Sequence, residues 1–185
     1  MSNEFDVNQF AEDLKQRYPD WKDSVLKASV LDNIGNGGHE KTTRGGEVLL
    51  QLAKELYTGG RILEIGTRNG ISAVILAQVG PVVTYDVKKR FLIDDIWAWQ
   101  GVQDRVEFRF RGQDPLDMSD VGLAFIDGDH SYDSVKQDFE EVKGCGRVIF
   151  HDCLHIRGVN EFIDGLNGDV QIKQSYFAVW RSDDD

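Results

Sequence analysis

Short apolar runs alternate with amphipathic stretches along the chain from residue 61 onward. The apolar runs have the continuous hydrophobicity typical of strands buried on both faces of a parallel sheet. They cover residues 61–65, 82–85, 106–110, 121–126 and 147–150. Apolar residues at helical spacing predict helices between them, over 71–78, 91–99 and 132–143. The alternation predicts an α/β fold with a doubly wound, mainly parallel sheet, right-handed crossovers and helices on both faces.

The N-terminal third follows a helical pattern instead. Apolar side chains near helical spacing over 5–14 and 21–30 predict two short helices, and those over 48–56 predict a third that ends at Gly59-Gly60. The polar, glycine-rich stretch 33–44 between them is expected to be a loop. These helices either cover the functional site or form a homodimer contact, and the pattern alone does not choose between the two.

The last two apolar runs, over 170–173 and 176–180, are separated by only two residues. That gap is too short for another crossover helix, so the pair predicts a terminal antiparallel hairpin after a helix over 159–166. Together with the five earlier runs, the hairpin gives a Rossmann-like sheet of seven strands.

Length and cysteine content limit the organisation of the chain. With 185 residues, 41% of them hydrophobic, the chain can bury one sizeable core but hardly two. We expect a single domain over 1–185, with N-terminal helices over 1–58 and the Rossmann-like core over 59–182. The two cysteines, Cys145 and Cys153, are too few for a disulfide framework and are expected to be free thiols in a reducing, cytoplasmic compartment.

The charge of the chain argues against two classes of partner. A net charge of -11 repels phosphate backbones and anionic lipid, and the densest basic run is only Lys88-Lys89-Arg90. The apolar stretches are far shorter than the roughly 20 residues that a membrane span requires. We therefore expect neither a nucleic acid nor a membrane as partner, and look for a small-molecule site.

The strongest chemical signal is the turn after the first predicted strand. That strand carries Glu64, and the turn contains Gly66 and Gly70 before a helix with Ser72 in its first turn. In an open α/β sheet, ligands bind outside the carboxyl ends of the strands where the strand order reverses, and the first such turn normally lies there. Gly66 lets the backbone approach a ligand, and the helix N-terminus offers free N–H groups.

A second acid follows at the end of the next strand. Asp86 lies twenty residues after Gly66, where a carboxylate can accept hydrogen bonds from both hydroxyls of a ribose. The turn lacks the central glycine of the nicotinamide fingerprint, and Glu64 would repel a pyrophosphate but attract an α-ammonium group. S-adenosylmethionine is therefore favoured over a nicotinamide dinucleotide as the ligand.

The segment Leu63-Glu-Ile-Gly-Thr-Arg-Asn-Gly-Ile-Ser72 resembles the first motif of class I S-adenosylmethionine-dependent methyltransferases. It is most similar to the catechol-type and sugar (macrocin O-methyltransferase-like) branches, and the resemblance extends over 42–180. It implies that Glu64 and Ser72 hold the methionine moiety, that Gly66 packs against it, and that Asp86 binds the ribose.

The resemblance also implies further donor-binding residues. Gln113 or Asp114, after the third strand, stands at the position that contacts adenine in these enzymes. We count Thr67 and Gly70 in the first turn, and Asp127 after the fourth strand, with the donor-binding residues.

Polar residues are dense where the fourth and fifth strands end. Asp127, Asp129 and His130 follow the fourth strand, and His151 and Asp152 follow the fifth. Because neighbouring strands lie about 4.8 Å apart, Asp127 and Asp152 can share one divalent cation. His151 has a structural alternative, as a strand-end residue hydrogen-bonded to a neighbouring loop.

In the resembling families an aspartate after the fourth strand and an acidic or amide pair after the fifth bind Mg²⁺, which holds the acceptor hydroxyl. Asp127 and Asp152 match that pattern, but Cys153 does not, because a thiol is a poor magnesium ligand. The metal is then weakly held, completed by other ligands, or absent. By the same resemblance Asp129 or His130 is the general base, although Asp129 has an alternative as a helix cap.

Two hypotheses about function follow. The first is an S-adenosylmethionine-dependent O-methyltransferase acting on a small hydroxylated acceptor, with a sugar among the candidates. The second is a donor-binding module without catalytic activity that serves as a regulatory or assembly subunit, suggested by Cys153 and by the absence of a dedicated substrate domain.

Overall fold

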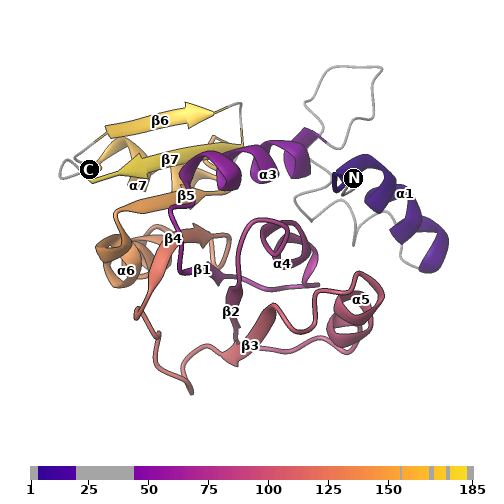
Figure 1. The fold of residues 1–185 in the computed structure, drawn as a ribbon. Coiled ribbons are helices and arrows are strands. Elements are labelled where there is room, and N and C mark those ends of the chain that lie inside the picture. The colour runs from indigo at the N-terminus through magenta and orange to yellow at the C-terminus, as the bar shows by residue number, and fades with distance from the viewer. Residues whose placement is uncertain (1–3, 20–43, 155, 167–168, 174–175, 183–185) are drawn as a thin grey trace.

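Seven strands form one sheet in the order β3-β2-β1-β4-β5-β7-β6 (Figure 1). The computed structural model describes residues 4–19, 44–154, 156–166, 169–173 and 176–182. The strands are β1 (Arg61–Ile65), β2 (Val82–Asp86), β3 (Val106–Phe110), β4 (Val121–Ile126), β5 (Arg147–Phe150), β6 (Asp169–Lys173) and β7 (Phe177–Arg181). The first five are parallel, and β7 is antiparallel to both β5 and β6. The predicted sheet and its terminal hairpin are confirmed.

Helices cover both faces of this sheet. They are α1 (Val7–Arg17), α3 (Arg44–Leu56), α4 (Ile71–Leu76), α5 (Ile93–Trp99), α6 (Tyr132–Val142) and α7 (Arg157–Asp164), with a 3₁₀ turn, η1 (Lys143–Cys145), after α6. The helix predicted over 21–30 and most of the loop predicted over 33–44 lie outside the described residues. None of the helices in the described ranges is long and apolar enough to cross a bilayer.

The core has two halves, one on each face of the sheet. Ile62 of β1 packs with the apolar faces of α1, α3, α4 and α5. Its neighbours Leu63 and Ile65 pack on the other face with α6 and α7. Burial on both faces explains why the central strands are mainly apolar, with Glu64 and Thr84 as buried exceptions.

The strand order reverses at β1, which lies between β2 and β4. Gly66 follows β1 with a φ of +102°, and a Cβ there would lie 2.1 Å from the carbonyl oxygen of Asp127. Only glycine allows this contact, since a side chain would meet backbone. The turns after β1 and β4 therefore meet at the edge of the sheet where ligands bind in this fold class.

Candidate functional site

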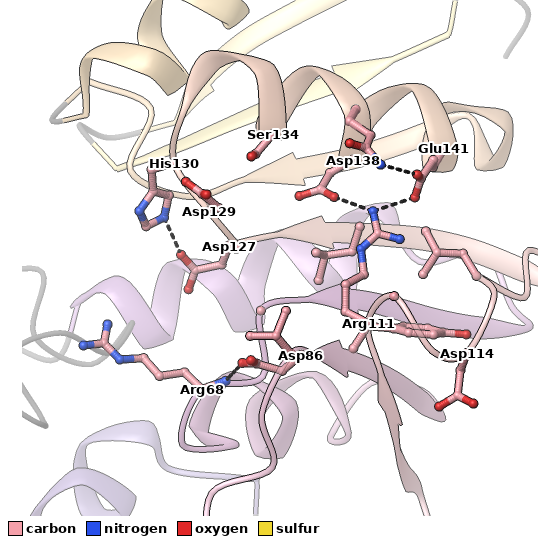
Figure 2. A pocket seen from close by; sticks show the side chains of 18 of the residues that line it. Arg68, Asp86, Arg111, Asp114, Asp127, Asp129, His130, Ser134, Asp138 and Glu141 are labelled. Atoms are coloured by element: carbon pink, nitrogen blue, oxygen red, sulfur yellow. Dashed lines mark hydrogen bonds and ion pairs between the residues drawn. The ribbon is translucent and has the colours of Figure 1, made fainter.

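A cavity of about 1380 Å³ opens at the carboxyl ends of the parallel strands (Figure 2). Its walls come from the β1–α4 turn, the ends of β2 and β5, the loops after β3 and β4, and one side of α6. Of the predicted site residues, the structure brings these to the cavity wall: Gly66, Asp86, Gln113, Asp114, Asp127, Asp129, His130 and Asp152. It does not place Glu64, Thr67, Gly70 or Ser72 on that wall.

Glu64 lies beneath the β1–α4 turn and is completely buried. Its Oε2 accepts a hydrogen bond from Thr84 Oγ1 at 2.5 Å, and Thr67 Oγ1 lies 2.6 Å from the same hydroxyl. Its Oε1 has no hydrogen-bond partner among the described residues. Burial, opposed by the hydroxyls of Ser72 and Thr84, raises the pKa of Glu64 to about 7.

The turn itself is held by backbone and ring contacts. Gly70 precedes α4 in the left-handed conformation, with a φ of +74°. Its carbonyl accepts a hydrogen bond of 3.0 Å from the buried indole of Trp97. Ser72, in the first turn of α4, is also buried. The sequence predicted this turn as ligand-binding, and the structure shows that its side chains form a polar layer under the backbone.

Asp86 projects from the end of β2 into the cavity (Figure 2). Its Oδ2 accepts a hydrogen bond from the backbone N–H of Arg68 at 2.7 Å, and its Oδ1 accepts one from the N–H of Lys88 at 3.1 Å. The carboxylate therefore ties the β1–α4 turn to the end of β2. Each carboxylate oxygen can accept more than one hydrogen bond, so both can still receive a ligand hydroxyl.

The loop after β3 is fixed by an ion pair that the sequence analysis missed. Arg111 contacts Asp138 at 2.7 Å and Glu141 at 2.6 Å, and both acids lie on α6 (Figure 2). Asp138 is buried, which raises its pKa, although Arg111 opposes the effect. The sequence does carry one sign of this contact. Asp138 and Glu141 are three residues apart, so they lie on the same face of a helix and can share a cationic partner. The pair holds the Gln113 segment against one wall of the cavity.

Two carboxylates and two imidazoles meet where β4 and β5 end. Asp127 Oδ1 lies 2.9 Å from His151 Nδ1 and 3.3 Å from His130 Nε2. Asp152 Oδ2 lies 3.5 Å from His151 Nδ1 and 3.6 Å from His130 Nε2. Asp152 adopts a φ of +56°, a conformation that aspartate tolerates better than most residues.

The charges in this cluster stabilise one another. Burial opposes the ionisation of Asp127, but the imidazoles of His151 and His130 outweigh it and lower the pKa of Asp127 to about 2. The hydrogen bond to Asp127 raises the pKa of His130. The pKa of His151 is also raised, because the attraction of Asp127 and Asp152 outweighs the burial of its ring.

Asp129, which follows β4, lines the cavity, whereas Cys153, which follows β5, is buried in the core. The Asp129 carboxylate accepts a hydrogen bond of 3.0 Å from the Ser131 backbone N–H and lines the cavity. The N-cap of α6 is Ser131, which accepts from the backbone N–H of Ser134. Cys153 is buried in the core, and burial raises the pKa of its thiol to about 11. Of the two neighbours of Asp152 in the sequence, His151 contacts the carboxylates of the cluster and Cys153 does not line the cavity.

Comparison with known proteins shows what part of the chain is similar to. Residues 63–153, from within β1 to just after β5, match the family model described as a methyltransferase domain. No protein with a curated description matches the sequence. The matched segment spans the β1–α4 turn and the carboxylate–imidazole cluster, so it includes the walls of the cavity at both ends.

Solved structures share the fold at low sequence identity. The O-methyltransferase TomG from Streptomyces achromogenes, in complex with S-adenosylmethionine, is 17% identical with a TM-score of 0.59, over 96% of this chain and 100% of that one. An O-methyltransferase from Bacillus cereus in complex with S-adenosylhomocysteine is 16% identical with a TM-score of 0.56, over 96% and 100%. Podospora anserina methyltransferase PaMTH1, bound to S-adenosylhomocysteine, is 14% identical with a TM-score of 0.58, over 98% and 99%.

Residues 63–153 are thus similar to a methyltransferase domain, and the chain has the fold of class I S-adenosylmethionine-dependent methyltransferases.

Proposed function

We propose that this protein is an S-adenosylmethionine-dependent O-methyltransferase that acts on a small hydroxylated acceptor, with a sugar among the candidates. The observation that carries the proposal is a single cavity with Asp86 and Gln113 at one end and Asp127, Asp129 and His130 at the other. Its volume of about 1380 Å³ exceeds the roughly 300–1,000 Å³ of a typical small-ligand site. The described walls thus leave room for a donor and an acceptor together.

The donor end of the cavity fits the polar groups of S-adenosylmethionine. The Asp86 carboxylate is already oriented by two backbone N–H groups, so it can accept the ribose hydroxyls without reordering. Gln113 offers an amide beside the same loop for the adenine. When bound, this cofactor supplies a methyl group activated by the neighbouring sulfonium.

Glu64, which lies beneath the β1–α4 turn, would attract the positively charged groups of the donor electrostatically. The unpartnered Oε1 in a fully buried carboxyl favours a cationic group nearby, because a positive charge lowers the cost of ionising it. The α-ammonium and the sulfonium of the cofactor both have this character. Thr67, Gly70 and Ser72 shape the same turn, and Gly66 lets its backbone reach the cavity.

The acceptor end of the cavity fits a metal and a base. The carboxylates of Asp127 and Asp152 would hold a divalent cation such as Mg²⁺, which would bind the acceptor hydroxyl and make it more acidic. His130 or the Asp129 carboxylate would take the proton of that hydroxyl as the oxygen attacks the methyl carbon and the methyl–sulfur bond breaks, which leaves S-adenosylhomocysteine. His130 is suited to this because Asp127 stabilises its protonated form.

The proposal is tested first by calorimetry. S-adenosylmethionine and S-adenosylhomocysteine are titrated into the purified protein, each with and without Mg²⁺. Micromolar binding is expected, since the cavity holds preformed partners for both. If neither ligand binds, the proposed function is wrong.

The assignment of the base is tested with two variants. Transfer of labelled methyl from S-adenosylmethionine is measured on a panel of catechols, simple sugars and nucleotide sugars. Asp129→Asn or His130→Ala, whichever removes the base, is expected to lower turnover about a hundredfold or more, while calorimetric binding of the donor stays within a factor of two or three. Normal turnover in both variants would show that neither residue is the base.

A further inference from the structure

His151 is a buried imidazole held rigidly at the edge of the cavity. Its exposed fraction is 6%. Its ring packs against two aromatic side chains, with centroid distances of 5.0 Å to Phe177 and 6.4 Å to Phe125. Since the ring cannot turn far from this position, the direction of its Nδ1 is set by the fold.

That nitrogen faces both carboxylates of the cluster. His151 Nδ1 lies 2.9 Å from Asp127 Oδ1 and 3.5 Å from Asp152 Oδ2. One donor atom from each of these residues lies within 4.8 Å of the other two. In an octahedral ion with bonds of about 2.1 Å, adjacent donors lie about 3.0 Å apart. The two distances from His151 Nδ1, 2.9 and 3.5 Å, are close to that spacing, and the two carboxylate oxygens need only come within about 3.0 Å of each other to complete one face of such an ion.

We propose that His151 Nδ1 is a third protein ligand of the metal, and that the site consequently prefers an imidazole-binding ion such as Mn²⁺ over Mg²⁺. The inference deepens the proposed function and rests on its placement of a metal between Asp127 and Asp152. Mg²⁺ favours an all-oxygen set of carboxylates, carbonyls and waters, whereas first-row transition ions accept imidazole nitrogen readily. One imidazole nitrogen and two carboxylate oxygens form a mixed ligand set, which suits a first-row transition ion better than it suits Mg²⁺.

His130 is the competing imidazole and serves as the control. Its Nε2 lies 3.3 Å from Asp127 Oδ1 and 3.6 Å from Asp152 Oδ2, both longer than the corresponding distances of His151. Its side chain retains 32% exposure, against 7% for His151. The more exposed ring can move to take and release a proton, and the buried ring is better suited to remain on the metal.

The test uses Mn²⁺ as a spectroscopic probe in the full-length chain. Electron spin echo modulation of bound Mn²⁺ reports nitrogen-14 that is directly coordinated, so the wild-type protein is expected to show the coupling of one imidazole. The coupling should vanish in His151→Asn and persist in His130→Asn. Competition between Mn²⁺ and Mg²⁺, followed by the free Mn²⁺ signal, should show the preference for Mn²⁺ falling about tenfold or more in His151→Asn, because the amide oxygen is a ligand that suits Mg²⁺.

Several results would overturn the inference. One is a wild-type Mn²⁺ complex without nitrogen coupling, and another is coupling lost in His130→Asn but kept in His151→Asn. If His151→Asn does not fold, persistence of the coupling in a triple variant of His39→Asn, His130→Asn and His155→Asn supports His151, the one histidine left, and its loss there counts against it. Absence of Mn²⁺ binding in a protein that binds S-adenosylmethionine also refutes the metal site, while the proposed function stands. That function is judged separately, by calorimetric binding of the donor and by transfer of its methyl group.

Discussion

The buried carboxyl of Glu64 makes the stability of the protein depend on pH, and replacing it with glutamine should remove that dependence. Glu64 is completely buried and its Oε1 has no hydrogen-bond partner among the described residues. Ser72 and Thr84 favour the charged form, whereas burial and the negative charges of Asp127 and Asp86 disfavour it. Glu64→Gln keeps the shape of the side chain and has no proton to lose.

The size of the effect follows from the pKa. The value rises from 4.5 to about 7 on folding, and each pH unit corresponds to about 1.36 kcal/mol, so the linkage amounts to about 3 kcal/mol. Between these two values the folded protein holds a proton that the unfolded chain has lost. The stabilisation from Glu64 is therefore complete below about pH 4.5 and is lost as the pH rises through about 7.

The measurement is the free energy of unfolding in urea from about pH 5 to pH 8, for wild type and Glu64→Gln. All other titrating groups are shared, so the difference between the two curves isolates Glu64. Wild type is expected to lose most of the 3 kcal/mol relative to the variant over this range. Parallel curves would refute the reasoning, because they would mean that Glu64 titrates alike in the folded and unfolded states.

Two further substitutions test the walls of the cavity. Gly66→Ala places a Cβ about 2.1 Å from the Asp127 carbonyl oxygen at a φ of +102° and should destabilise the protein by at least about 2 kcal/mol in thermal or urea unfolding. Gly144→Ala is the control, because a Cβ there meets nothing within 4 Å, and it should change stability by less than about 1 kcal/mol. If the two substitutions destabilised the protein equally, the close approach of the turns after β1 and β4 would be contradicted. Asp86→Asn removes the charge at the end of β2 and should weaken calorimetric binding of S-adenosylmethionine about tenfold to a hundredfold, whereas Asp133→Asn, on α6 outside the cavity wall, should not. Unchanged affinity in Asp86→Asn would remove this residue from the donor site.

The sequence could predict those parts of the fold that are determined by residues close together in the chain. The strand over 61–65 was predicted with its observed bounds because burial on both faces favours a run that is mainly apolar, here interrupted by Glu64. Asp86 and Asp127 could be placed at one edge because parallel strands end on the same side. The hairpin at the end of the chain followed from a connection too short to cross the sheet.

The parts that could not be predicted depend on residues far apart in the sequence. Arg111 meets Asp138 across 27 positions, and only the packing of α6 on the sheet decides that contact. The burial of Glu64 depends on Thr84 in the neighbouring strand. The pairing of His151 with Asp127 was foreseen only as a bond to some neighbouring loop, because the direction of its ring is set by Phe177 at the other end of the chain.

The order of strands in space has a consequence for how the protein is made. β7 fills the place between β5 and β6, yet it is the last of the seven strands to be synthesised. Until residue 181 has left the ribosome, the hydrogen-bonding edge of β5 is open, and an open edge can pair with another chain. Chains interrupted before β7 would therefore be prone to aggregate, even though the whole segment from β1 to β5 had already emerged.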